Sequence, residues 1–178
     1  MIHQEKPDWF VRSKTAADAA WIPSVMRQEW GSEIVAVHGQ VFQPVDLAGF
    51  IAEEKGRIAG LLTYHMEGKA CEIVTLNSWH RCIGVGTALI EAVEQEARKR
   101  SCRRLWLITT NDNLAALGFY QKRGFSLRAL HPGSVARLRT LKPEIPGTGC
   151  EGIPIRDEIE LEMDLQEIDA KDAGQLPA

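Results

Sequence analysis

The sequence reads RCIGVGT at residues 81–87 and TNDNLAALGFYQKRGF at residues 110–125. The first stretch leads into Gly86–Arg100, where apolar residues recur at helical spacing and cations close the last turn. Between the two stretches, the continuous apolar run within Arg104–Thr110 predicts a strand covered on both faces. The second stretch predicts a helix over Asn113–Arg123, ended by Gly124 in the left-handed conformation with Phe125 packing back on it. Strand, helix and strand in about forty residues indicate one βαβ crossover.

Upstream of the crossover, short connections join three strand-like runs, which predict an antiparallel meander. These runs are Leu47–Glu53, Arg57–Glu67 and Lys69–Asn77. The N-terminal part predicts a strand at Trp9–Arg12, a helix at Ala16–Trp30 interrupted near Pro23, and an irregular or partly extended segment at Ser32–Pro44. The predicted fold class is therefore α/β, as an α+β mixed sheet with an antiparallel meander plus one βαβ crossover.

Downstream, the sequence predicts a strand at Phe125–Leu130, a short helix at Ser134–Leu141 and a long loop at Lys142–Pro154. Ile155–Leu165 then alternates with period two: one face carries Ile159, Leu161, Met163 and Leu165, and the other carries Glu158, Glu160, Glu162 and Asp164. Burying such a carboxylate row without partners is costly, so we expect it to be exposed. It is either a solvated sheet face or a surface that attracts a cationic amine.

Composition narrows the class of protein. With 178 residues and 44% hydrophobic residues, the chain predicts a single domain over residues 1–165, followed by a flexible tail at 166–178. The net charge of −3 argues against a nucleic-acid partner. No long apolar run or signal-like start suggests a membrane, and the four cysteines lack metal-ligand spacing, so we expect a cytoplasmic protein without a metal.

The 81–87 stretch has the features of a phosphate loop. Its two glycines permit close approach of a ligand to the main chain, and unpaired amides at the start of the next helix attract anions. Arg81 adds a cation at its mouth. Taken alone, the motif could equally form only a tight turn. A third glycine at Rossmann spacing and a Walker Lys-Ser or Lys-Thr are both missing.

The two stretches together resemble the GNAT (GCN5-related) N-acetyltransferase superfamily. Arg-x-x-Gly-x-Gly looks like its acetyl-CoA signature, and the 110–125 stretch looks like its "Asn…Ala…Phe-Tyr…Gly-Phe" block, at the family separation. The close match spans about fifty residues, and the flanking strands extend it over nearly the whole chain. The resemblance implies the GNAT acyl-CoA N-acyltransferase fold with splayed central strands, in a small single-domain member of bacterial type.

By this resemblance, acetyl-CoA is the acyl donor. Leu76, Asn77 and Ser78 would make strand-like contacts with its pantetheine arm, and a backbone amide there would hold the thioester oxygen. Asn113 would contact it from the second helix, and Tyr120 would lie at its thiol end. The pyrophosphate would be held by Arg81, Cys82, Ile83, Gly84, Val85, Gly86 and Thr87.

Two residues are the catalytic candidates. Tyr120 matches the family tyrosine that protonates the CoA thiolate; the alternative is an aromatic residue that only packs beside Phe119. Glu72, on the strand before the loop, is the candidate general base; the alternative is a surface carboxylate. Simple alternation places Glu72 with Val74 and Leu76, opposite Ile73 and Thr75.

We therefore expect an N-acetyltransferase that acts on a primary amine, of a small molecule or a peptide, by direct attack in a ternary complex. One alternative is a catalytically silent fold that binds acetyl-CoA for sensing. Another is a mixed α/β interaction domain without a cofactor. The sequence leaves the amine unidentified, although the Lys142-Pro143 loop is a candidate border of its site, and leaves oligomeric state open, homodimers being common among relatives.

Overall fold

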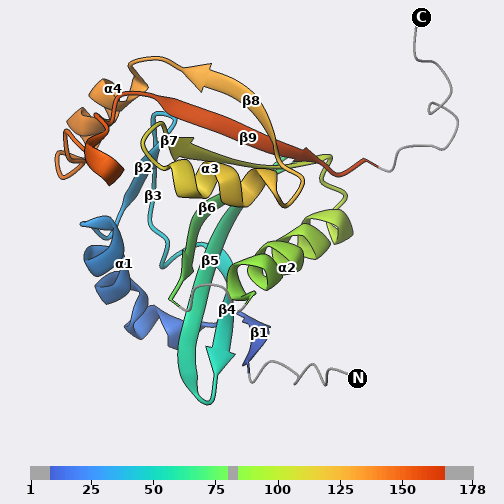
Figure 1. The fold of residues 1–178 in the computed structure, drawn as a ribbon. Coiled ribbons are helices and arrows are strands. Elements are labelled where there is room, and N and C mark those ends of the chain that lie inside the picture. Colours follow the sequence, from blue (N-terminus) through green and yellow to red (C-terminus); the bar gives the residue numbers. More distant parts are fainter. Residues whose placement is uncertain (1–8, 80–83, 167–178) are drawn as a thin grey trace, which may run out of the picture.

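The computed structural model describes residues 9–79 and 84–166 as a twisted sheet with helices on both faces (Figure 1). The helices are α1 (Ile22–Trp30), α2 (Val85–Lys99), α3 (Leu114–Gln121) and α4 (Ser134–Leu141), with 3₁₀ turns η1 (Ala16–Ala20) and η2 (Cys150–Gly152). The strands are β1 (Trp9–Ser13), β2 (Val35–Val37), β3 (Gln40–Phe42), β4 (Ala48–Glu54), β5 (Arg57–Glu67), β6 (Ala70–Ser78), β7 (Arg104–Thr110), β8 (Ser126–His131) and β9 (Glu158–Asp164).

Seven strands form one mixed sheet in the order β1-β4-β5-β6-β7-β9-β8. The predicted meander is confirmed, because β4, β5 and β6 pair antiparallel in sequence order. The predicted crossover is also confirmed, since α2 connects β6 to a parallel β7. The last strand, β9, inserts antiparallel between β7 and β8.

The two central strands diverge. Pairing between β6 and β7 runs from Ala70–Arg104 to Ile73–Leu107, although β6 continues to Ser78 and β7 to Thr110. A bulge at the divergence point makes Val74 the extra residue of β6, since Thr63 faces Thr75 while the next residue of β5, Tyr64, faces Ile73. The sheet therefore opens a gap at the end of β6 that leads into α2.

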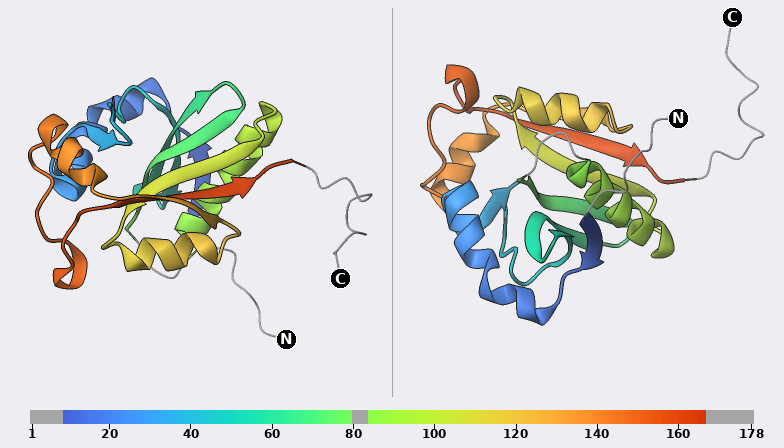
Figure 2. Two further views of the ribbon diagram at one scale, coloured as in Figure 1. Left: turned by 90° about the horizontal axis from the view of Figure 1, so that it is seen from above. Right: turned by 60° about the horizontal axis from the view of Figure 1, so that its bottom comes forward.

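Apolar packing fills both faces of the sheet. On one face, α2 and α3 cover a core that includes Leu89, Val93, Leu107 and Leu161. On the other, α1 and the β2–β3 hairpin cover a second core that includes Met26. Figure 2 shows α1 and α2 on opposite sides of the sheet.

Gly60 on β5 lets α2 pack closely against the sheet. A Cβ there would lie 2.7 Å from Val85 Cγ1 and 2.9 Å from the Asn77 carbonyl. The missing side chain therefore sets the distance between helix and sheet.

The partly extended alternative for Ser32–Pro44 is confirmed, because the segment contains a regular hairpin, β2–β3, in which Val37 and Gln40 are the last pair before the turn. Two expectations are wrong in detail. First, β7 is not fully covered on both faces: Leu105 and Leu107 are buried, while Trp106 and Ile108 are only half-buried.

Second, the carboxylates of β9 are not a solvated row, because only Asp164 is exposed. Glu158 is fully buried, and Glu160 and Glu162 form ion pairs with Arg104. Alternation predicted their common face but not the strands and loops that cover it.

Within residues 9–79 and 84–166, no helix is both long and apolar enough to cross a bilayer. The same residues contain no group of three or more His, Cys, Asp or Glu side chains placed to hold a metal ion.

Candidate active site

The N-terminus of α2 faces the gap between β6 and β7. Its N-cap, Gly84, has φ +87°, a left-handed conformation that favours glycine, and no side chain of the described residues caps the helix. The first-turn amides therefore remain available to an anionic ligand. At the next glycine, Gly86, a Cβ would lie 3.0 and 3.3 Å from two ring carbons of Phe119 on α3. The backbone conformation thus favours glycine at position 84, and the close approach of Phe119 favours it at position 86.

Arg123, just after α3, brings a cation to this helix start. Its Nε and Nη2 donate to the Thr87 hydroxyl at 2.9 and 2.6 Å, and its Nη1 donates to the Phe119 carbonyl at 2.7 Å. Its guanidinium carbon also lies 3.5 Å from the centre of the Phe119 ring. The guanidinium is therefore fixed beside the first turn of α2.

The predicted residues of β6 lie along the gap, beyond the last pair with β7. Leu76, Asn77 and Ser78 pair with β5 on their other side. The Asn77 side chain accepts a hydrogen bond from Trp30 Nε1 at 3.1 Å, which ties the end of α1 to this strand.

The predicted loop is described only in part. Gly84, Val85, Gly86 and Thr87 form the N-cap and first turn of α2. The expectations for Arg81, Cys82 and Ile83 lie outside the described residues.

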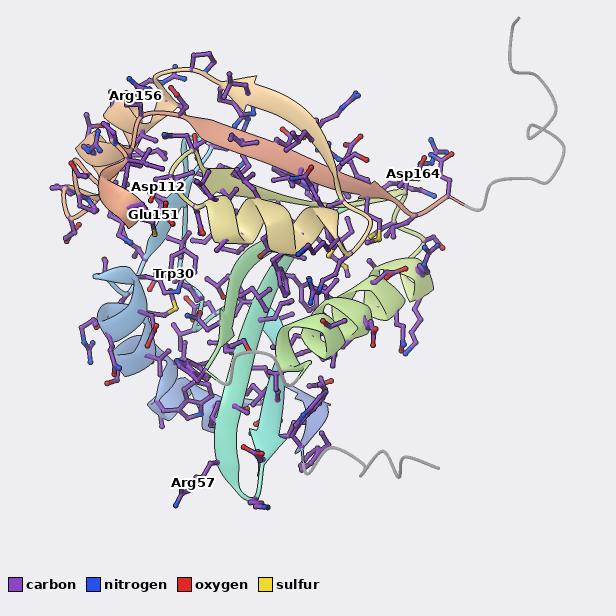
Figure 3. The ribbon with its side chains drawn as sticks, viewed as in Figure 1. Trp30, Arg57, Asp112, Glu151, Arg156 and Asp164 are labelled. Carbon is purple, nitrogen blue, oxygen red and sulfur yellow. The ribbon has the colours of Figure 1, made fainter. Side chains whose placement is uncertain are left out.

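Asn113 caps α3 across the gap from β6. Its Oδ1 accepts a hydrogen bond from the Ala116 amide at 3.2 Å, as an N-cap residue does. The two residues before Asn113 hold the loop between α4 and β9. Asn111 Oδ1 accepts from the amides of Arg156 and Asp157, and Asp112 accepts from the Cys150 amide. Figure 3 shows Asp112 close to Glu151 of η2.

Tyr120 lies on the α2 side of the sheet and is 8% exposed. Its ring makes edge contacts with Phe119 and Phe125, at centroid distances of 5.2 and 5.5 Å. Burial raises the pKa of the phenol above its ordinary value, while the Arg123 cation opposes this shift. The hydroxyl therefore stays protonated at neutral pH.

Glu72 lies on the opposite face of the sheet and is 5% exposed, so the surface-carboxylate alternative is wrong. Burial, helped by the negative charge of Glu160, raises its pKa to about 7, although Arg104 lowers it. Its expected alignment with Leu76 is also wrong. The bulge at Val74 places Val74 in the α1-side core and Leu76 against the α2-side core.

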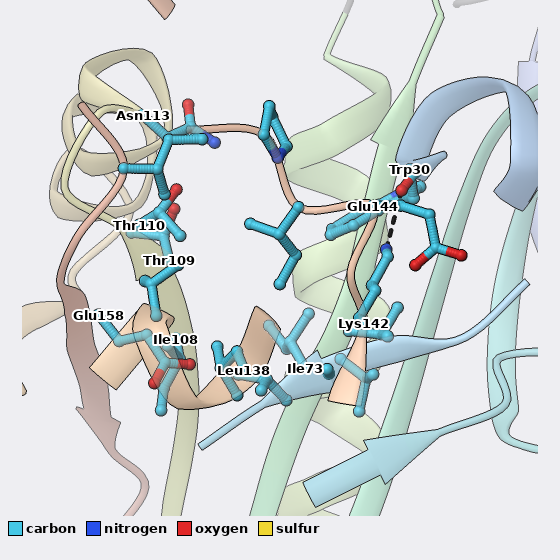
Figure 4. Close-up of a pocket in the computed structure, with 18 residues that line it drawn as sticks. Trp30, Ile73, Ile108, Thr109, Thr110, Asn113, Leu138, Lys142, Glu144 and Glu158 are labelled. Carbon is cyan, nitrogen blue, oxygen red and sulfur yellow. Dashed lines mark hydrogen bonds between the residues drawn. The ribbon is translucent and has the colours of Figure 1, made fainter. Parts of the chain in front are cut away.

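A cavity of about 240 Å³ opens beside the gap, on the α1 side of the sheet (Figure 4). It extends from the middle of β6 and the end of β7 to α4 and the segment after it. Its walls are mainly aliphatic, and neither Glu72 nor Tyr120 is among the residues that line it. The lining includes Trp30, Val35, Val37, Ile73, Val74, Ile108, Asn113, Val135, Leu138, Lys142, Ile145 and Glu158.

Sequence reasoning did not single out three charged residues of this region. Arg123 was assigned only to a helix end, Glu158 to a carboxylate row that is either solvated or attracts a cationic amine, and Lys142 to a loop that is a candidate border of the amine site. The signal for Glu158 was present in the alternation of β9, but its burial depends on the β2–β3 turn, where the His38 amide donates to it at 2.9 Å. Nothing local indicates that Lys142 is buried.

Comparisons with known proteins agree with this architecture. The model of the "Acetyltransferase (GNAT) family" matches residues 9–125. The uncharacterized protein YdhI of Bacillus subtilis is 47% identical over 133 residues, which cover 74% of this chain and 83% of YdhI. The uncharacterized protein YxbD of the same organism is 40% identical over 146 residues, covering 82% and 92% of the two chains.

Among solved structures, a GNAT family acetyltransferase from Elizabethkingia anophelis with acetyl-CoA bound superimposes with a TM-score of 0.64. It is 18% identical in sequence, and the match covers 89% of this chain and 99% of the other. At this identity the likeness establishes the shared fold.

Proposed function

The chain belongs to the GNAT acetyltransferase family, and we propose that it transfers the acetyl group of acetyl-CoA to a primary amine. The observation that carries this proposal is the divergence of β6 and β7, which opens between an uncapped helix start and a cavity. The phosphates and the reacting ends of the substrates thereby have separate places along one gap. Relatives of this fold have been solved with acetyl-CoA bound, which supports the same donor here.

The described residues fit the anionic end of CoA. The amides of Val85, Gly86 and Thr87 start a helix that no side chain within residues 9–79 and 84–166 caps, so they and the helix dipole suit a pyrophosphate. We add Arg123 to this set because its guanidinium is bonded to Thr87. Arg81, Cys82 and Ile83 remain proposed members of the loop on sequence grounds.

The pantetheine arm would run along the side of β6 that faces the gap. Leu76, Asn77 and Ser78 are proposed to pair with it where β7 has diverged. Asn113, at the cap of α3, would contact it from the other side of the gap. Binding in this place directs the thioester toward the cavity.

The reaction forms an N–C bond between the amine and the acetyl carbon and breaks the C–S bond. The amine nitrogen must give up a proton, and we propose Glu72 as its acceptor, through water because Glu72 does not line the cavity. A carboxyl group with a pKa of about 7 is half ionised at neutral pH and can both take and release that proton.

Tyr120 is the proposed acid that protonates the departing sulfur. Burial keeps the phenol protonated at neutral pH, so Tyr120 has a proton to donate to the departing sulfur. Because Tyr120 and Glu72 approach from opposite faces of the sheet, the two proton transfers do not compete for one group.

The experiment is a thiol-release assay with purified protein, acetyl-CoA and a broad amine panel, followed by mass analysis of the amine. Amine-dependent release of CoA thiol, matched by acetylated amine, supports the proposal. Tight CoA binding without release for any amine favours the alternative, a silent CoA-binding protein. If millimolar acetyl-CoA fails to raise the melting temperature, the protein is not an acetyl-CoA binder.

A further inference from the structure

The cavity beside the gap holds two buried charges of opposite sign. Glu158 is 2% exposed and Lys142 is 5% exposed, while most of the wall between them is aliphatic. Figure 4 shows their side chains on opposite sides of the cavity. Charged side chains are rarely buried to this extent without partners, so the atoms of Glu158 and Lys142 that lack a partner indicate where a ligand can bind.

Glu158 has one oxygen in use and one without a partner. Oε1 accepts the His38 amide hydrogen at 2.9 Å, whereas Oε2 has no hydrogen-bond partner among the described residues. Glu160 and Glu72 add carboxylates on the same face of the sheet, and Arg104 and His131 lie at ion-pair distance from Glu160 rather than from Glu158. A buried carboxylate oxygen in an acidic neighbourhood is a site for a cationic donor.

Lys142 follows α4 and points into the other side of the cavity. Its Nζ donates to the Trp30 carbonyl at 2.8 Å, which uses one of the three ammonium hydrogens. Within the described residues, no carboxylate forms an ion pair with it at hydrogen-bond distance; the carboxylate that acts on it electrostatically is Glu144, which is exposed. Two donors of a buried ammonium thus remain for an anionic ligand.

We infer that the acceptor is a small zwitterion, whose amine meets Glu158 Oε2 and whose carboxylate or similar anionic group meets Lys142 Nζ. The inference rests on the proposed acetyl transfer and names the substrate class of that site. A volume of about 240 Å³ is about eight times that of a water molecule, which suits a free amino acid. Amines of a single positive charge would leave Lys142 without a counter-charge, and diamines would place a second cation against it.

The first test compares wild-type kcat/KM by thiol release for matched acceptors. The panel contains glycine, β-alanine, γ-aminobutyrate and leucine, the amide of each, the corresponding alkylamines, and diamines of similar length. We expect the best aminocarboxylate to exceed its own amide by at least about tenfold, as for a lost charge-assisted hydrogen bond. This comparison needs no variant, so it decides even if a variant does not fold.

The second test uses Lys142→Met. We expect KM for the aminocarboxylate to rise about tenfold or more while KM for the matched amide stays unchanged, a difference that a purely structural role would not produce. Lys14→Met is the control, because Lys14 Nζ also donates to backbone carbonyls, of Val45 and Leu47, away from the cavity. It should leave the acid-to-amide ratio at the wild-type value.

The third variant is Glu158→Gln, which keeps the shape of the side chain and an acceptor for the His38 amide. We expect it to raise KM about tenfold or more for acids and amides alike, whereas Glu162→Gln, on the same strand but outside the cavity, should not.

A wild-type preference for alkylamines or diamines, or an unchanged acid-to-amide ratio in Lys142→Met, overturns the zwitterion assignment while acetyl transfer still stands. Failure of the proposed function gives a different result, because no amine of any charge then releases thiol.

Discussion

Tyr120 is an aromatic residue that we propose both packs and reacts. Its ring lies in the α2-side core between Phe119 and Phe125, and its phenol has a raised pKa. Removal of the hydroxyl should leave the ring contacts intact and remove only the proton. The packing alternative and the catalytic one therefore predict different outcomes for the same variant.

We predict that Tyr120→Phe lowers kcat by about 10²-fold, the usual contribution of a positioned acid, while Kd for acetyl-CoA and the melting temperature change little. Steady-state thiol release, calorimetric titration with acetyl-CoA and thermal unfolding measure the three quantities. A Tyr120→Phe enzyme with wild-type turnover would show that the residue only packs.

Glu72 should control the pH dependence of the reaction. The charged groups that act on it are Glu160, Glu158, Glu67 and Arg104, and burial is the largest cause of its raised pKa. Because a base must be ionised, wild-type kcat/KM should rise through about pH 7. In Glu72→Gln this rising limb should disappear and kcat should fall about 10²-fold. If the variant keeps the same limb, another group is the base.

Glu72 should also lower the stability of the folded protein at the pH values at which it is ionised. Since the pKa of Glu72 is higher in the folded protein than in the unfolded chain, the wild type loses stability as pH rises from about 4.5 to about 7. At pH 8, Glu72→Gln should therefore unfold with a free energy up to about 3 kcal/mol higher than the wild type. Urea titrations at pH 4 and pH 8 measure the difference, which should vanish at pH 4.

At the scale of elements, the α2–α3 junction should hold the phosphates. Arg123→Met removes the guanidinium beside Thr87, so we predict about tenfold weaker binding of CoA. Binding of a pantetheine analogue without phosphates should not change. Lys122→Met is the matched control, because Lys122 is the exposed neighbour in the same turn. Equal losses for CoA and the analogue would assign Arg123 a structural role only.

The close contact between α2 and β5 should make the stability of the protein sensitive to any side chain added at Gly60. Gly60→Ala places a Cβ against Val85 and the Asn77 carbonyl, and we predict a loss of about 1–3 kcal/mol in unfolding free energy. Gly118→Ala is the control, since that glycine lies within α3 with open space around its Cβ position. It should be neutral or stabilise by up to about 1 kcal/mol. Similar behaviour of the two variants in chemical denaturation would contradict close packing at Gly60.

Most elements could be predicted from local pattern. The helix at Ser134–Leu141 and the strands of the meander follow from apolar period and turn residues, which are properties of neighbouring positions. The bulge at Val74 and the burial of Glu158 depend on contacts with β5 and with the β2–β3 turn. Alternation assigned Glu72 and Leu76 to one face. This assignment is wrong because a single extra residue in a strand reverses every later side chain.

The site shows the same division. Family motifs located the helix start and Tyr120, since both lie on one continuous segment of sequence. Lys142 and Glu158 come from different elements, so only the fold reveals that they share a cavity.

At the scale of the whole molecule, one sheet joins the two ends of the described chain. β1 is one edge of that sheet, and β9 lies inside it between β7 and β8. The gap and the cavity meet where β6 and β7 diverge. In the proposed reaction, donor and acceptor would meet there without a covalent enzyme intermediate.

The most direct measurement is amine-dependent thiol release from acetyl-CoA by the full chain, with the amine product identified by mass. We predict release that saturates with amine, one acetyl group gained by the amine for each thiol released, and loss of this turnover in Tyr120→Phe. A protein that acetyl-CoA stabilises against heat, yet that releases no thiol with any amine of the panel, would contradict the account.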